Sequence, residues 1–139
     1  MSYTNTMLES HPREASVDRE ILATCLESCI DCGQACTACA DSCLAEEVLD
    51  GLRKCIRLDL DCADICATAA RVTTRQTEFE AATSTALLEA CSQACKSCAE
   101  ECEQHAEHHA HCRTCAEACR RCADACDQLV SAMRRGSAT

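Results

Sequence analysis

Cysteine is the residue that could do chemistry in this chain, because 18 of its 139 residues are Cys. Within four segments the Cys follow one another mostly at steps of three or four residues, which keep side chains on one face of an α-helix. The 18 candidate ligands are Cys25, Cys29, Cys32, Cys36, Cys39, Cys43, Cys55, Cys62, Cys66, Cys91, Cys95, Cys98, Cys102, Cys112, Cys115, Cys119, Cys122 and Cys126. Thiolates arranged in this way are ligands for soft metals, namely Cu(I), Zn(II) or iron–sulfur clusters.

A long and even stripe of thiols favours ions that share their ligands over separate sites. An iron–sulfur cluster needs one compact set of four Cys, and zinc prefers four tetrahedral ligands, which Cys on two helices could supply. If each Cu(I) lies between two thiolates and each thiolate bridges two ions, the ratio approaches one monovalent ion per thiolate. Such a cluster is neutral and avoids the cost of uncompensated buried charge. We therefore predict storage of multiple Cu(I) ions, with a zinc- or cadmium-buffering, metallothionein-like protein as the alternative.

The Cys could also serve in core packing, in disulfides or in redox chemistry, and each of these roles requires a different pattern of Cys. Thiols could serve only as small core residues, although they oxidise easily. Disulfides could join the helices, since Cys29 and Cys39, or Cys112 and Cys122, have the spacing of helical hairpins, but the Cys between them would lack partners. A thiol redox protein needs one or two exposed reactive Cys, whereas this pattern buries all of them alike. No nucleophile with a matching base and orienting residue is visible, so we expect no enzyme.

Helices must carry these stripes, because Gly and Pro are scarce and Ala, Glu, Leu and Arg are abundant. The predicted helices cover 16–45, 52–72, 84–108 and 112–134. Ser16 can cap the first helix, Asp50 and Gly51 predict a turn, and residues 73–83 form a longer connection. No segment alternates with a period of two, so no strand is expected. The fold class is therefore all-α, an antiparallel up-down-up-down four-helix bundle with a Cys-lined core.

The bundle is expected to span residues 16–135, between a flexible N-terminal arm (1–15, with a short helical start after Pro12) and a C-terminal tail (136–139). The net charge of −10 argues against nucleic acid as a partner. No apolar run is long enough to cross a membrane, so no membrane partner is expected. Residues 1–16 show no secretory signal, and we therefore expect a cytoplasmic protein whose thiols stay reduced.

A His-rich turn is expected at one end of the bundle, close to the Cys that start or end three of the stripes. The four candidate ligands there are His105, His108, His109 and His111. His105 and His109 continue the third stripe beyond Cys102 at steps of three and four. Imidazole can hold copper and pass it to thiolates, so we predict a polar mouth where Cu(I) enters. The alternative is a solvated, His-rich turn without a role.

Asp59 continues the second stripe, four residues after Cys55 and three before Cys62. We predict that it contributes to the metal site at the mouth. A capping role, or an ion pair with Arg53 or Arg57, is the alternative interpretation.

Apolar residues continue the stripes at the opposite end of the bundle. They are Ile21, Leu22, Ala69, Ala70, Leu87, Leu88, Leu129, Val130 and Met133. We expect them to form an apolar plug that closes the tube and stabilises the metal-free protein.

The Cys stripes of residues 18–134 resemble those of the copper storage proteins (Csp), a family of bacterial four-helix bundles packed with Cys. The resemblance implies Cu(I) bound inside the bundle and commonly a homotetramer of bundles. No leader sequence is visible in the chain, and in this respect it resembles the cytosolic branch of the family. Copper ions, delivered by chaperones or small thiols, are then the expected partners.

Overall fold

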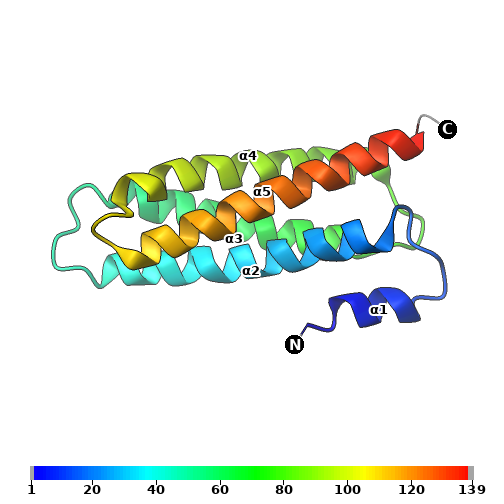
Figure 1. The fold of residues 1–139 in the computed structure, drawn as a ribbon, viewed down its shortest axis with the longest axis horizontal. Helices are drawn as coiled ribbons and strands as arrows, with labels where there is room; N and C mark the ends of the chain where they lie inside the picture. The colour runs from blue at the N-terminus through cyan, green and yellow to red at the C-terminus, as the bar shows by residue number, and fades with distance from the viewer. Residues whose placement is uncertain (1, 138–139) are drawn as a thin grey trace.

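The computed structural model describes residues 2–137 and contains five helices over that range, with no strand. The helices are α1 (Thr4–Ser10), α2 (Arg19–Leu44), α3 (Arg53–Thr73), α4 (Ala81–His105) and α5 (Ala110–Ser137). Helices α2 to α5 run alternately up and down and pack as a bundle, whereas α1 lies outside against α2 (Figure 1). The prediction of an all-α antiparallel four-helix bundle is confirmed. None of these helices combines the length and the apolar character needed to cross a membrane.

The predicted helix boundaries needed several corrections. Asp18, not Ser16, caps α2, because its Oδ1 accepts a hydrogen bond of 3.1 Å from the amide of Ile21. Helix α4 begins earlier than expected, where the Glu80 carboxylate accepts a hydrogen bond of 2.6 Å from the amide of Thr83. The predicted turn after α2 is present, and Gly51 adopts a φ of +86°. Residues with a Cβ atom rarely adopt this backbone conformation.

The segment expected as a flexible arm contains α1, so the short helix precedes Pro12 instead of following it. Leu8 is its buried residue and joins the core cluster, which explains why the helix lies against α2. At the other end, α5 continues to Ser137, two residues into the expected tail. Residues 138 and 139 of that tail lie outside the described residues, and the division of the chain into arm, bundle and tail stays a prediction.

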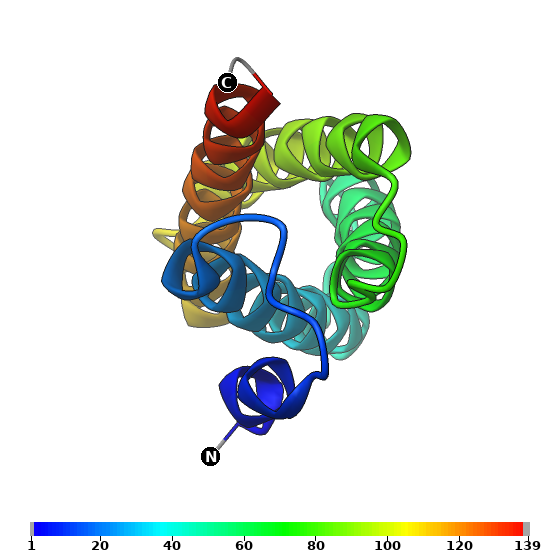
Figure 2. The same ribbon diagram turned by 90° about the vertical axis from the view of Figure 1, so that its right-hand side faces the viewer.

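The end of the bundle opposite the α2–α3 and α4–α5 connections is apolar, as predicted. Its fully buried side chains include Leu22, Leu88 and Leu129, with Val130 and Met133 close to full burial. The chain between α1 and α2 crosses this end in front of the bundle axis (Figure 2). Ala15 and Val17 of that segment pack against the core cluster. These contacts provide ordinary hydrophobic stabilisation that does not depend on a metal.

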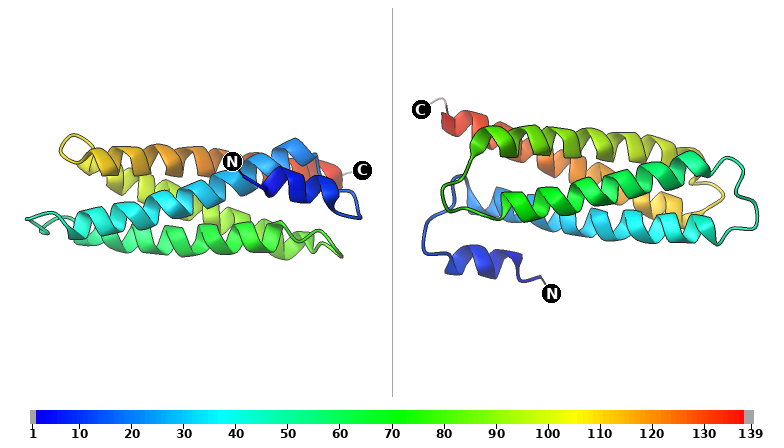
Figure 3. Two further views of the ribbon diagram at one scale, coloured as in Figure 1. Left: turned by 90° about the horizontal axis from the view of Figure 1, so that it is seen from below. Right: turned by 180° about the vertical axis from the view of Figure 1, so that it is seen from behind.

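Gln76 connects the α3–α4 connection to the segment before α2, and both lie at the apolar end (Figure 3). Its Oε1 accepts hydrogen bonds from the amide and the hydroxyl of Ser16, and its Nε2 donates one to the carbonyl of Thr73. The side chain is 5% exposed. Replacing Gln76 with Ala leaves these partners unpaired and is expected to lower the free energy of unfolding by about 1–3 kcal/mol. Urea unfolding of the reduced apo protein, compared with exposed Gln34→Ala, measures this; equal stability of the two variants would contradict it.

Candidate metal centre

All 18 Cys are free thiols and all are buried inside the bundle. The helical stripes explain this directly, because each Cys lies on the face of its helix that points to the bundle axis. The closest Sγ atoms on different helices lie 3.6 Å apart, as for Cys36 and Cys119 and for Cys55 and Cys102. A disulfide needs about 2.05 Å. The Cys are therefore arranged as a continuous array of separate thiols.

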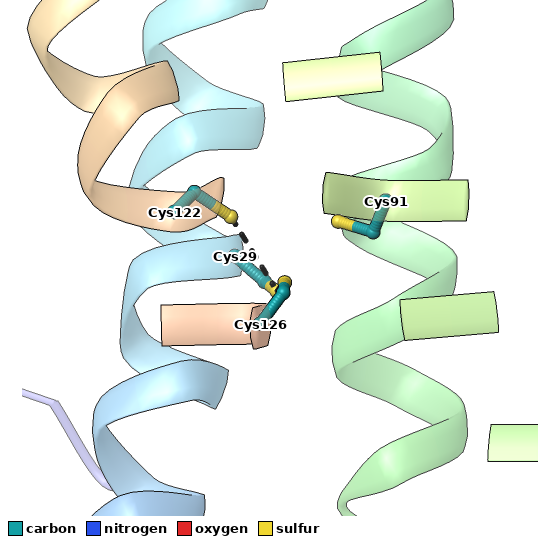
Figure 4. A group of neighbouring side chains, drawn as sticks. All are labelled: Cys29, Cys91, Cys122 and Cys126. Atoms are coloured by element: carbon teal, nitrogen blue, oxygen red, sulfur yellow. Dashed lines mark hydrogen bonds between the residues drawn. The ribbon is translucent and has the colours of Figure 1, made fainter. Parts of the chain in front are cut away.

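Groups of four Sγ atoms, each atom within 4.8 Å of the others, follow one another along the axis. Four such groups are Cys29, Cys91, Cys122 and Cys126; Cys32, Cys66, Cys95 and Cys122; Cys32, Cys36, Cys62 and Cys119; and Cys36, Cys98, Cys115 and Cys119. In the first group, Cys91 of α4 faces the other three thiols from the opposite side of the axis (Figure 4).

These groups overlap, and the overlap decides what they can bind. Four thiols each belong to two of the four groups, namely those of Cys32, Cys36, Cys119 and Cys122. A thiol that belongs to two neighbouring groups can bridge two ions. The array therefore fits a chain of bridged ions better than a set of independent tetrahedral sites.

Asp59 lies among the thiols rather than at the surface, and its side chain is fully buried. Its Oδ1 accepts hydrogen bonds of 3.1 Å from Cys98, 3.2 Å from Cys115 and 3.6 Å from Cys102. Its Oδ2 is buried without a hydrogen-bond partner among the described residues. Burial, reinforced by the Cys98 thiol, raises the pKa of Asp59 to about 9, so the carboxyl is neutral in the apo protein at pH 7.

The alternative of an ion pair for Asp59 is wrong. Arg57 instead forms an ion pair of 3.0 Å with Asp61 on the outside of α3. Oδ2 of Asp59 is a buried oxygen without a hydrogen-bond partner among the described residues, and it is surrounded by thiols. It is therefore available to ligate a metal ion together with those thiols.

His111 is the histidine that reaches the thiols. Its Nδ1 lies 3.4 Å from Sγ of Cys39 and 3.6 Å from Sγ of Cys112. With Cys43 these residues form a mixed group whose ligand atoms all lie within 4.8 Å of one another. This group closes the array at the end where the α2–α3 and α4–α5 connections meet (left in Figure 1).

The other three histidines occupy different positions at the same end. Nε2 of His105 lies 2.8 Å from the buried carboxylate of Glu101, and Nδ1 of His109 lies 2.7 Å from the half-buried carboxylate of Glu46. The side chain of His108 is exposed. The structure thus brings His111 to the thiols and places His105 and His109 against carboxylates. His111 lies four residues before Cys115, but it was outside the helix predicted for 112–134.

Two thiols of the mixed group, Cys43 and Cys112, hold their protons more tightly than a free thiol does. Burial raises the pKa of the Cys43 thiol to about 11, and burial also raises the pKa of Cys112. Burial alone would lower the pKa of His111, but the hydrogen bonds with Cys39 and Glu46 outweigh it and raise that pKa. A cation that binds Cys43 or Cys112 must therefore displace a proton from that thiol, so metal affinity at this end is expected to fall with falling pH.

Sequence reasoning missed two carboxylates at this end, Glu46 and Glu101. Both side chains contact His rings, and Glu101 also lies 4.0 Å from Nζ of Lys54. Glu101 stands directly before Cys102 on α4 and Glu46 follows α2, so neither is on a Cys stripe. Acidic residues are abundant in the chain, and no spacing singles these two out.

Comparison with known families gives one match over most of the chain. Residues 18–131 match the family described as copper storage protein. A curated relative, the uncharacterized cysteine-rich protein YhjQ of Bacillus subtilis, is 53% identical over 47 residues. That alignment covers 34% of this chain and 44% of the relative, so it spans less than half of the relative's length.

Solved structures of similar proteins cover nearly the whole chain. The copper storage protein Ccsp from Streptomyces lividans, loaded with 10 copper equivalents, is 48% identical with a TM-score of 0.91, over 93% of this chain and 98% of that one. A form of it with five coppers is described as a cytosolic copper storage protein, at 51% identity, a TM-score of 0.79, and 81% and 93% coverage. Cu(I)-bound Csp3 of Bacillus subtilis is 40% identical with a TM-score of 0.68, over 76% and 94% of the two chains.

Proposed function

Because the chain belongs to the copper storage protein family, we propose that it binds and stores many Cu(I) ions inside its helical bundle. The observation that carries this proposal is the overlap of the buried four-thiol groups along the axis. Shared thiolates allow one monovalent ion per thiolate, which leaves the filled interior neutral. The similar proteins are themselves copper-loaded, which supports the choice of metal.

Zinc fits the same array less well for an electrostatic reason. A zinc ion held by four thiolates that it does not share carries a net charge of −2, and several such sites would lie close together in the core. Burying repeated negative charge is costly. Cu(I) avoids this cost because its charge balances one thiolate.

The proposed ligands are the 18 thiolates, with His111 completing the group at the mouth and Asp59 supplying a carboxyl within the array. His105 and His109 are proposed to hold Cu(I) transiently as it enters, whereas the exposed His108 is not placed at the thiols. The activity is storage without catalytic turnover. We propose a cytoplasmic location, in line with the relative described as cytosolic.

Assembly and delivery follow from the same proposal. The family resemblance implies a homotetramer, and Ile30 and Leu60 on the outer faces of α2 and α3 are about half exposed, as expected of residues in an interface. Chaperones or small thiols are the expected sources of Cu(I), because free Cu(I) would be captured by other thiols.

The test is an anaerobic titration of the reduced apo protein with Cu(I) against a chromogenic chelator, repeated with Zn(II). We expect uptake of Cu(I) to near or above one ion per Cys, and retention of only a few Zn(II). Lowering the pH should release Cu(I), because protons compete for the thiolates. Saturation at a few ions of either metal would contradict the proposal and favour a zinc buffer or a thiol redox protein.

A further inference from the structure

Glu46 contacts two imidazole rings at once, although it lies outside every Cys stripe. Its Oε2 is 2.7 Å from Nδ1 of His109 and 3.2 Å from Nε2 of His111. The two rings are stacked, with centroids 5.4 Å apart. Glu46 follows α2 and the two histidines belong to the α4–α5 turn and the start of α5, so one carboxylate joins two connections at the mouth (Figure 1).

An ionised carboxylate can only accept hydrogen bonds. The ring nitrogens that face Glu46 must therefore carry the protons, which are Nδ1–H in His109 and Nε2–H in His111. In the neutral ring of His111 the lone pair is then on Nδ1. That atom is the one directed at the thiols of Cys39 and Cys112.

We infer that Glu46 is a positioning residue, which fixes the tautomer and the orientation of His111 so that Nδ1 is ready to ligate an ion beside Cys39, Cys43 and Cys112. This inference rests on the proposed function for the identity of the ion, but its structural part does not. A carboxylate that holds the second nitrogen of a ligating His orients the ring and increases its basicity. Glu46 itself is not a member of the group that these three thiols form with His111, and it bonds to the far nitrogen of the ring.

A second pair at the same end follows the same arrangement. The carboxylate of Glu101 accepts a hydrogen bond of 2.8 Å from Nε2–H of His105. His105 is not a member of the mouth group of Cys39, Cys43, His111 and Cys112. The tautomer of His105 beside Glu101 can therefore be compared with that of His111 beside Glu46, as a case in which the ring is outside that group. The exposed neighbour Glu47 provides a matched control, since it has the same charge and lies next to Glu46 in the sequence.

The test compares Glu46→Ala, Glu46→Gln and Glu47→Ala in the full-length protein. Nitrogen-detected correlation spectra of the apo protein, recorded at a pH at which the ring of His111 is neutral, report its tautomer. We expect Nε2–H in the wild type and in Glu47→Ala, and a mixture of tautomers in Glu46→Ala. Glu46→Gln should resemble the wild type, because the amide oxygen of Gln can also accept from Nε2–H.

Cu(I) alone, added at one equivalent against a chelator, provides the second readout. Loss of a group that orients a ligand typically costs 10- to 100-fold in metal affinity, so we expect Glu46→Ala to weaken Cu(I) binding by about 10-fold or more. Glu46→Gln should recover most of this loss. In a His111→Ala background, Glu46→Ala should have no additional effect on affinity.

Three outcomes would overturn the inference: an unchanged tautomer in Glu46→Ala, a loss in Glu46→Gln as large as in Glu46→Ala, or an additional loss in the His111→Ala background. The tautomer measurement needs no metal, so it tests Glu46 even in a chain that takes up no copper. Conversely, full Cu(I) uptake with an unchanged tautomer would overturn only the role of Glu46.

Discussion

Replacing Cys32 and Cys122 together with Ser is expected to reduce Cu(I) capacity by more than the two thiolates removed. Each of these Cys belongs to two of the overlapping groups, and the pair shares one group with Cys66 and Cys95. Their loss affects three successive groups at once. Without the bridging thiolates, the ions next to the gap lose ligands that they share, so we expect a loss of more than two ions.

The matched control is the double variant of Cys25 and Cys43, which also removes two thiols but at the two ends of the α2 stripe. Cys25 contacts the thiol of Cys126 at 3.9 Å, whereas Cys32 contacts four thiols, those of Cys36, Cys62, Cys95 and Cys119. We expect a loss of about two ions, one monovalent ion for each thiolate removed. Capacity is measured by anaerobic titration against a chelator, after circular dichroism has shown that both variants remain helical. Equal losses in the two variants would show that each thiol binds independently and would contradict bridging.

Replacing Asp59 with Asn is expected to stabilise the apo protein at neutral and higher pH. The pKa of Asp59 is raised from 3.8 to about 9 in the folded state, chiefly by burial. Between these values the unfolded chain is ionised and the folded chain holds the proton, so folding takes up a proton. The free energy of unfolding therefore falls as the pH rises through this window, and the stability associated with this group is fully present only below about pH 4.

The amide that replaces the carboxyl does not titrate, so the pH-dependent cost disappears in the variant. After allowance for unsatisfied amide donors, we expect Asp59→Asn to be more stable than the wild type by about 3 kcal/mol at pH 8. The difference should shrink as the pH falls towards 5. Urea unfolding of the reduced, metal-free protein between pH 5 and 8 measures it. Asp64→Asn, which removes a charge from the exposed side of α3, controls for net charge.

A constant difference between Asp59→Asn and the wild type across this pH range would contradict the raised pKa. A gain in stability of the same size in Asp64→Asn would assign the effect to the overall negative charge of the protein instead. The buried carboxyl of Asp59 thus lowers the free energy of unfolding of the apo protein at neutral pH. That cost is consistent with a group retained for ligation rather than for folding.

The helices, their antiparallel arrangement and the burial of the Cys could all be predicted from the sequence. The reason is that steps of three and four residues are a local signal, which places the Cys on one face of each helix. The apolar end was equally predictable, because Leu22, Leu88 and Leu129 continue the same faces. Asp59 was identified by its position on a stripe, although its three thiol partners on α4 and α5 were not.

The tertiary structure alone decided which groups act at the mouth. Periodicity favoured His105 and His109, whereas the structure directs His111 to Cys39, a residue 72 positions away in the sequence. The Glu46 carboxylate that holds this ring is 65 positions from it. His111 lies in the first turn of α5, and its ring is held by contacts with the segment that follows α2, which residue spacing does not encode. The thiol array was therefore determined by the sequence itself, and its entrance by the way the segment after α2 packs against the start of α5.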